Sequence, residues 1–245
     1  MGTLAMYKKY FRLQEYPFEN TPDPRFYFNS HSHREALANM VYGVREAKGL
    51  ILVTGDVGAG KTMLIQELKQ ELGEQHWVVE TATPWISADE LLHTLRVRLD
   101  VKIPDEGEHS LIEALKDKLI GLHAENRRVV LAVDEAHLLP DRTLEGIRLL
   151  SNLQTPQHKL IQIILLGQEE LLGKLARYSL RQLEQRIALR CTLTPLNPEE
   201  THDYIAFRLR VAGGSEALFT PDSLDLIVQE SAGVPRRINL LCDNA

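Results

Sequence analysis

The segment Gly55–Thr62 places two glycines, a lysine and a threonine at the spacing Gly-x-x-x-x-Gly-Lys-Thr. Glycines at these positions let backbone amides turn inward around phosphate oxygens, where a side chain would collide. The lysine brings a positive charge to the β- and γ-phosphates, and the threonine hydroxyl can bind Mg²⁺. The segment therefore predicts a loop that binds ATP or ADP with Mg²⁺, formed by Gly55, Asp56, Val57, Gly58, Ala59, Gly60, Lys61, Thr62 and Met63.

A pair of acidic residues follows an apolar run further along the chain. Val129–Val133 has the composition of a buried strand, and Asp134 and Glu135 come directly after it. Asp134 is expected to join Thr62 in binding the metal, whereas Glu135 is expected to orient or deprotonate the attacking water. His137 is expected to be structural or at the surface, because no HxxxH or HExxH spacing indicates a metal site.

Phosphoryl transfer also requires a polar contact to the γ-phosphate and a positive charge at the transition state. Gln168 follows the apolar run Ile161–Leu166 and is a candidate for the first role; the alternative is a glutamine exposed in a turn. Arg181 and Arg186 are candidates for the second, which contributes roughly 10³–10⁵ in rate when an arginine acts in trans. The alternative is that both arginines lie on a solvated helix face.

The elements that must position these residues follow from hydrophobic patterning. A helix over Lys61–Leu72 carries its leucines on one face, and two later helices begin with the capping pairs Ser87/Glu90 and Ser110/Glu113. Strands that alternate with helices predict an α/β fold with a parallel five-stranded sheet covered on both faces. The five strands are expected at Leu50–Thr54, Trp77–Thr81, Val129–Val133, Ile161–Leu166 and Ala188–Leu193.

The pattern becomes purely helical after Leu196, and this change divides the chain into residues 1–196 and 197–245. Asn197 caps the first helix of the smaller part, and Pro221 and Pro235 begin two more. The last helix is still amphipathic at Ala245, which favours a longer natural protein. The aromatic and proline-rich lead-in, Tyr7–Ser30, either stabilises the fold or lines a nucleotide pocket.

Composition excludes several classes of protein. The chain has 245 residues, a formal net charge of −6 and a pI near 5.9, a balance that argues against a sequence-blind DNA-binding protein. Its two cysteines lack the CxxC spacing, which makes a disulfide framework or a zinc site improbable and favours a reducing compartment. Apolar runs are strand-sized, and no signal peptide is recognisable, so a cytoplasmic location is expected.

These residues together resemble the AAA+ ATPases, which are P-loop NTPases, and among them the general secretion pathway protein A group. The resemblance covers nearly the whole chain. It rests on the nucleotide-binding loop and acidic pair, and on His33-Arg34-Glu35-Ala36-Leu37 and Leu165-Leu166-Gly167-Gln168. More discriminating are the aromatic and proline pattern and the closing motif, Tyr16-Pro17-Phe18, Thr21-Pro22-Asp23-Pro24-Arg25 and Gly233-Val234-Pro235-Arg236-Arg237-Ile238-Asn239.

The resemblance implies an α/β core with an α-helical lid and a nucleotide bound between them. It implies that Gln168 is sensor 1, that Arg236 in the lid is sensor 2, and that Arg186 is an arginine finger reaching a neighbouring subunit of a ring, which the resemblance implies is a hexamer. One residue departs from the group, in which a proline follows the sensor glutamine; here Glu169 follows Gln168.

The sequence suggests three functions for this core, of which two are retained. The first is an ATPase that drives assembly of a secretion or envelope machine, with a membrane-associated partner bound through segments outside this chain and no sequence-specific nucleic acid. The second is a DNA-binding transposition regulator of the TnsC/TniB type, for which Arg208, Arg210, Arg236 and Arg237 would form a positive strip. The third, a DEAH-box helicase suggested by residues 134–137, is rejected because a second motor domain is missing.

Overall fold

The computed structural model describes residues 4–81, 83, 85–102 and 111–245. The chain divides into two compact units. The helical unit comprises Met1–Arg34, Asp56–Met63 and Leu193–Ala245, and the sheet unit comprises Glu35–Gly55 and Leu64–Thr192.

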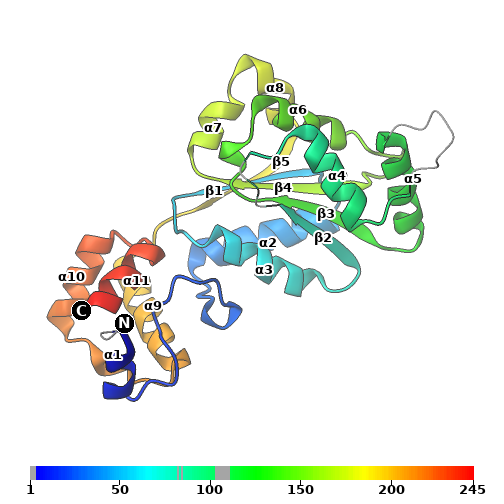
Figure 1. Ribbon diagram of the computed structural model, residues 1–245. Coiled ribbons are helices and arrows are strands. Elements are labelled where there is room, and N and C mark those ends of the chain that lie inside the picture. Colours follow the sequence, from blue (N-terminus) through cyan, green and yellow to red (C-terminus); the bar gives the residue numbers. More distant parts are fainter. Residues whose placement is uncertain (1–3, 82, 84, 103–110) are drawn as a thin grey trace. The chain divides into compact units, whose positions relative to one another are not determined.

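The sheet unit contains a five-stranded sheet in the order β2-β3-β4-β1-β5 (Figure 1). The pairs β2–β3, β3–β4 and β1–β4 are parallel. Near the carboxyl ends of β1 and β5, Thr54 Oγ1 donates a hydrogen bond to the Cys191 carbonyl oxygen over 3.5 Å, which indicates that β5 runs in the same direction. The predicted parallel sheet is therefore confirmed. Its strands are β1 (Leu50–Gly55), β2 (His76–Thr81), β3 (Arg128–Val133), β4 (Ile161–Gly167) and β5 (Ile187–Leu193).

Helices cover both faces of this sheet (Figure 1). One face carries α2 (His31–Arg45) and α3 (Lys61–Leu72), and the other carries α4 (Ala88–Arg98), α5 (Leu111–Ala124) and α6 (Asp141–Leu150). Every residue of β1 and β4 is buried, as expected for strands covered on both sides. The capping box of Ser87 and Glu90 is confirmed at the start of α4, whereas Ser110 lies outside the described residues.

Several short elements were not predicted from the sequence. Between β3 and β5 the chain forms α6, α7 (Glu170–Leu175), α8 (Arg181–Glu184) and the 3₁₀ turns η2 (Ala136–Leu138) and η3 (Tyr178–Leu180). Helices of four to six residues span too few turns to show a hydrophobic period, so tertiary packing determines them.

The helical unit contains α9 (Pro198–Val211), α10 (Pro221–Ser231) and α11 (Pro235–Asn244), which begin where the sequence predicted. It also contains α1 (Leu4–Tyr10) and the 3₁₀ turns η1 (Pro24–Phe26) and η4 (Glu216–Leu218). Phe18 of the lead-in is buried in the same apolar cluster as Tyr204, Ile205 and Ile238. The lead-in therefore contributes to the core of this unit; the division at residues 196 and 197 stays a prediction.

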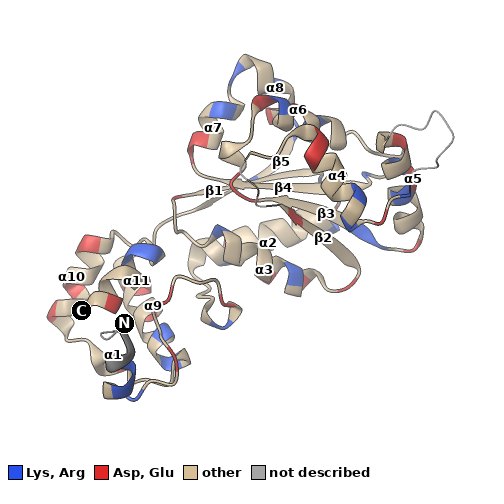
Figure 2. Ribbon diagram, in the orientation of Figure 1, with Lys and Arg blue, Asp and Glu red and all other residues tan. Residues whose placement is uncertain are grey.

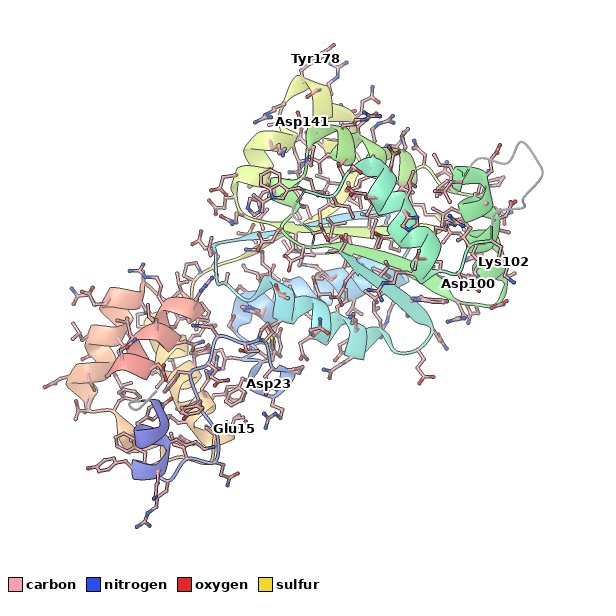
Figure 3. The ribbon with its side chains drawn as sticks, viewed as in Figure 1. Glu15, Asp23, Asp100, Lys102, Asp141 and Tyr178 are labelled. Carbon is pink, nitrogen blue, oxygen red and sulfur yellow. The ribbon has the colours of Figure 1, made fainter. Side chains whose placement is uncertain are left out.

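Ion pairs also order the lead-in. Arg25 pairs with Glu15 over 2.7 Å and with Asp23 over 2.6 Å, and Figure 3 shows both carboxylates on this segment. Hydrogen bonds from Arg25 lower the pKa of the half-buried Asp23 carboxyl below its ordinary value. Cys191 and Cys242 are free and buried. In the part of the chain that the structure describes, no helix is long and apolar enough to cross a bilayer.

Candidate active site

The predicted nucleotide-binding loop is a tight turn between β1 and α3. Gly58 and Gly60 have φ values of +79° and +95°, a region that residues with a β-carbon rarely adopt. The Ala59 amide donates to the Asp56 carbonyl oxygen over 3.2 Å. Lys61 is 5% exposed, and its Nζ donates to the same carbonyl over 2.8 Å. The lysine is thus held within the loop, where it is predicted to bind the phosphates of a nucleotide.

The loop has the chemistry that a phosphate group requires. A β-carbon on Gly60 would lie 2.9 Å from the His33 Nε2 atom, so the backbone at this position has room for glycine alone. Lys61 and Thr62 lie in the first turn of α3, where the helix dipole favours an anion. Thr62 is exposed and supplies a hydroxyl of the type that Mg²⁺ binds. The residues present therefore fit a magnesium nucleotide.

Arg236 lies beside this loop. It occupies the first turn of α11, and a β-carbon placed on Gly58 would be 2.5 Å from the Arg236 Cβ and 3.2 Å from its Cδ. The structure thus brings the predicted sensor 2 arginine to the phosphate loop within the helical unit. Its contact with a nucleotide stays a prediction.

The acidic pair lies at the carboxyl end of β3. Asp134 is 6% exposed; its amide donates to the Thr81 carbonyl oxygen over 2.9 Å, and its Oδ1 accepts the Glu135 amide over 2.8 Å. Glu135 has a φ of +51°, which is uncommon for a residue with a side chain and often marks functional sites. This backbone conformation turns the chain out of the strand directly after Asp134.

His137 connects the acidic pair to the neighbouring strand, a contact that the sequence did not predict. Its Nδ1 lies 3.3 Å from the Glu135 Oε2 and 3.4 Å from the amide nitrogen of Gln168. A hydrogen bond to Glu135 requires a proton on Nδ1, whereas a hydrogen bond from Gln168 requires a lone pair there. The imidazole can therefore make one of these two bonds at a time.

Gln168 lies between the carboxyl ends of β1 and β3. It follows β4, which pairs with β1 on one side and β3 on the other; Thr54 is opposite Gly167, and Val133 is opposite Leu165. The missing proline does not alter the turn, because Glu169 has a φ of −60°, the value that proline would impose. Gln168 thus lies at the carboxyl end of the strands, where a residue that contacts the γ-phosphate is expected.

The two candidate arginine fingers lie away from the carboxyl ends of the strands. Arg186 is exposed and precedes β5, so it lies at the amino-terminal edge of the sheet, where its charge contributes to lowering the pKa of Lys159 after the larger effect of burial. Arg181 stacks over the Tyr178 ring at 4.2 Å, and Figure 3 shows Tyr178 extending into solvent. Within the sheet unit, neither arginine joins Asp134 and Glu135.

The four arginines considered for a DNA-binding strip have separate surroundings within the helical unit. Arg208 is buried, Arg210 pairs with Glu216 over 2.6 Å, and Arg237 donates to the Glu230 carbonyl oxygen over 2.6 Å. Figure 2 shows acidic and basic residues together on these helices. The described residues also contain no group of three or more His, Cys, Asp and Glu arranged to hold a metal.

Comparisons with known proteins agree with this fold. Residues 44–175, just over half of the chain, match the family described as "AAA domain". General secretion pathway protein A of Aeromonas hydrophila is 40% identical over 242 residues, which is 98% of this chain and 44% of the relative. The chain therefore spans less than half the length of this curated relative.

Solved structures share the architecture at low sequence identity. The ORC2 protein of Aeropyrum pernix, solved with ADPNP and ADP, is 16% identical with a TM-score of 0.65, covering 93% of this chain and 64% of that one. A Walker-type ATPase of Pyrococcus abyssi is 18% identical with a TM-score of 0.65, covering 91% and 69%. These similarities support the fold. The match over residues 44–175 and the 40% identical relative show that the chain belongs to the AAA domain family and is related to general secretion pathway protein A.

Proposed function

We propose that this chain is the ATP-hydrolysing part of a bacterial protein that drives assembly of a secretion or envelope machine. The observation that carries the proposal is the arrangement of three neighbouring strands. Asp134 and Glu135 follow β3, Gln168 follows β4, and the phosphate loop follows β1, which pairs with β4. The relationship to general secretion pathway protein A supports the secretion role.

In the proposed reaction, backbone amides of the loop and the Lys61 ammonium hold the phosphates of ATP. Thr62 and Asp134 would hold Mg²⁺, which supplies positive charge to the phosphate oxygens when bound. Glu135 would orient a water molecule for in-line attack and accept its proton. Gln168 would hydrogen-bond the γ-phosphate, and Arg236 would contact the nucleotide beside Gly58. The products are ADP and phosphate.

We also propose that turnover requires a ring of subunits, a hexamer by resemblance to the family. Arg186 lies at the amino-terminal end of the strands, whereas Asp134 and Glu135 of the same chain lie at the carboxyl end. This position suits action on a neighbouring subunit. Segments outside this chain would bind a membrane-associated partner at the inner face of the membrane, with the ATPase part in the cytoplasm and without sequence-specific nucleic acid. The buried and paired arginines of the helical unit give no support to a transposition role.

Two substitutions test the hydrolysis site. Lys61→Ala should weaken ATP binding by roughly 10- to 100-fold, because it removes a charge-assisted contact. Glu135→Gln should retain ATP binding and slow phosphate release by roughly 10²–10⁴-fold. Calorimetry with magnesium and ATP measures the first effect, and a phosphate-release assay measures the second.

One control lies on the same helix as Lys61, and the other is a glutamate at the opposite end of β3 from Glu135. Lys69→Ala changes a partly exposed lysine of α3 that pairs with Glu80, and Glu125→Gln changes an exposed glutamate before β3. Both should behave as the parent chain. The proposal fails if the parent shows no heat with millimolar ATP and magnesium, or if Glu135→Gln hydrolyses ATP at the parental rate.

A further inference from the structure

A buried histidine just after the lead-in contacts the phosphate loop from outside the segment that matches the AAA domain family. His33 is 5% exposed and lies in the first turn of α2, before the matched residues 44–175. Its ring hydrogen-bonds the backbone of Ala59, and its Nε2 faces Gly60, where a β-carbon would be 2.9 Å away. Both contacts lie within the helical unit.

The other ring nitrogen of His33 has a buried partner of its own. Nδ1 lies 2.7 Å from the hydroxyl oxygen of Ser30, which is 2% exposed. The Tyr27 ring packs against the imidazole in an edge-to-face arrangement, with centroids 5.9 Å apart. The imidazole is therefore held on both sides.

These contacts define one tautomer. Burial lowers the pKa of His33, and the hydrogen bond with the Ala59 backbone raises it by less, as expected when the ring donates to a carbonyl oxygen. The neutral imidazole thus carries its proton on Nε2 and accepts the Ser30 hydroxyl at Nδ1. Glu200 is the charged group that acts on it, and it favours the protonated form.

The direction of the Ala59 carbonyl determines where the next amide points. A trans peptide is planar, so the carbonyl of Ala59 and the N–H of Gly60 point in opposite directions. When His33 holds that carbonyl, the Gly60 amide is directed away from the histidine. Without this bond, the peptide can rotate and turn a carbonyl oxygen toward the bound anion, which would repel it.

We propose that His33 is a positioning residue for the triphosphate: by holding the Ala59 carbonyl, it keeps the Gly60 amide directed at the phosphates. The role rests on the proposed function, because it requires that the loop bind a nucleotide. Ser30 and Tyr27 of the lead-in contact this histidine, so the proposal connects the lead-in to nucleotide binding, one of the two roles that the sequence had left open for it.

The test compares two amides that replace different ring nitrogens. His33→Gln places its amide near the position of Nε2 and can still donate to Ala59, whereas His33→Asn places its amide near Nδ1 and cannot. We expect His33→Asn and His33→Ala to weaken binding of magnesium ATP and ADP about tenfold, the effect of one lost hydrogen bond at the upper end of its range. His33→Gln should remain within about threefold of the parent.

Calorimetry gives the dissociation constants, and melting of the nucleotide-free proteins verifies that they are folded. His31→Gln, at an exposed position of the same helix turn, is the matched control and should bind as the parent does. Equal nucleotide affinity for the Asn, Gln and parent chains would overturn the positioning role, even if all variants melt at lower temperature. A parent chain that binds no nucleotide would instead overturn the proposed function.

Discussion

Arg208 and Arg210 lie two residues apart on α9 and have opposite surroundings. The buried Arg208 guanidinium donates to the carbonyl oxygens of Pro17 and Glu19 and, over 2.8 Å, to the Tyr204 hydroxyl. It also lies 4.8 Å from the centroid of the Phe26 ring. This side chain therefore connects the lead-in to α9 through backbone carbonyl oxygens, and the sequence alone does not show which carbonyls accept these bonds.

Truncation of Arg208 should destabilise the helical unit strongly. Arg208→Ala leaves buried carbonyl oxygens without a donor, and we expect the free energy of unfolding to fall by about 3 kcal/mol or more. Arg210→Ala removes an exposed ion pair with Glu216 and should cost less than about 1 kcal/mol. Urea unfolding followed by circular dichroism compares them. Similar midpoints for both variants would contradict the structural role of Arg208.

At the scale of the elements, the turn between α10 and α11 determines where α11, the helix that carries Arg236 in its first turn, begins. Gly233 has a φ of +72°, its carbonyl oxygen accepts the Leu196 amide over 2.9 Å, and a β-carbon at this position would overlap the Leu196 carbonyl oxygen. Backbone therefore packs on backbone, an approach that only glycine permits.

Gly73 provides a matched control for this turn. It has a similar φ of +67°, but no heavy atom lies within 4 Å of a β-carbon placed there. Gly73→Ala should cost about 1–2 kcal/mol from the left-handed conformation alone. Gly233→Ala should cost more than that and should also weaken ATP binding, because it displaces the first turn of α11. Equal losses in chemical denaturation, with unchanged nucleotide affinity, would show that the close approach is unimportant.

At the scale of the whole molecule, the proposed ring predicts complementation between variants. Arg186→Ala should bind ATP normally and lose roughly 10³-fold or more in turnover. Mixing it with Lys61→Ala should restore part of the activity, because the intact loop of one chain can receive Arg186 from the other. Steady-state phosphate release at several mixing ratios measures this effect.

Arg181→Ala separates the two candidate fingers. Arg181 is exposed and stacks on Tyr178, so its substitution should leave turnover close to that of the parent. Failure of any mixture to regain activity, or a loss with Arg181→Ala as large as with Arg186→Ala, would remove the assignment of Arg186.

The sequence by itself determined the loop, the acidic pair and the strands that carry them. Each depends on neighbours in the chain: the spacing of Gly58, Gly60 and Lys61, or an apolar run that ends at Asp134. Local backbone conformation and burial follow from such short patterns, which is why the predicted strand positions were confirmed to within a residue or two.

Tertiary structure alone decided which distant residues meet. It brought His33 to Gly60, His137 to Gln168 and Arg208 to the carbonyl of Pro17, contacts that bridge up to 191 residues and leave no periodic trace in the sequence. It also placed Arg186 at the amino-terminal end of the strands and Glu135 at the carboxyl end, because β5 runs in the same direction as the other strands. Contacts of this kind depend on how whole elements pack, and no local pattern encodes them.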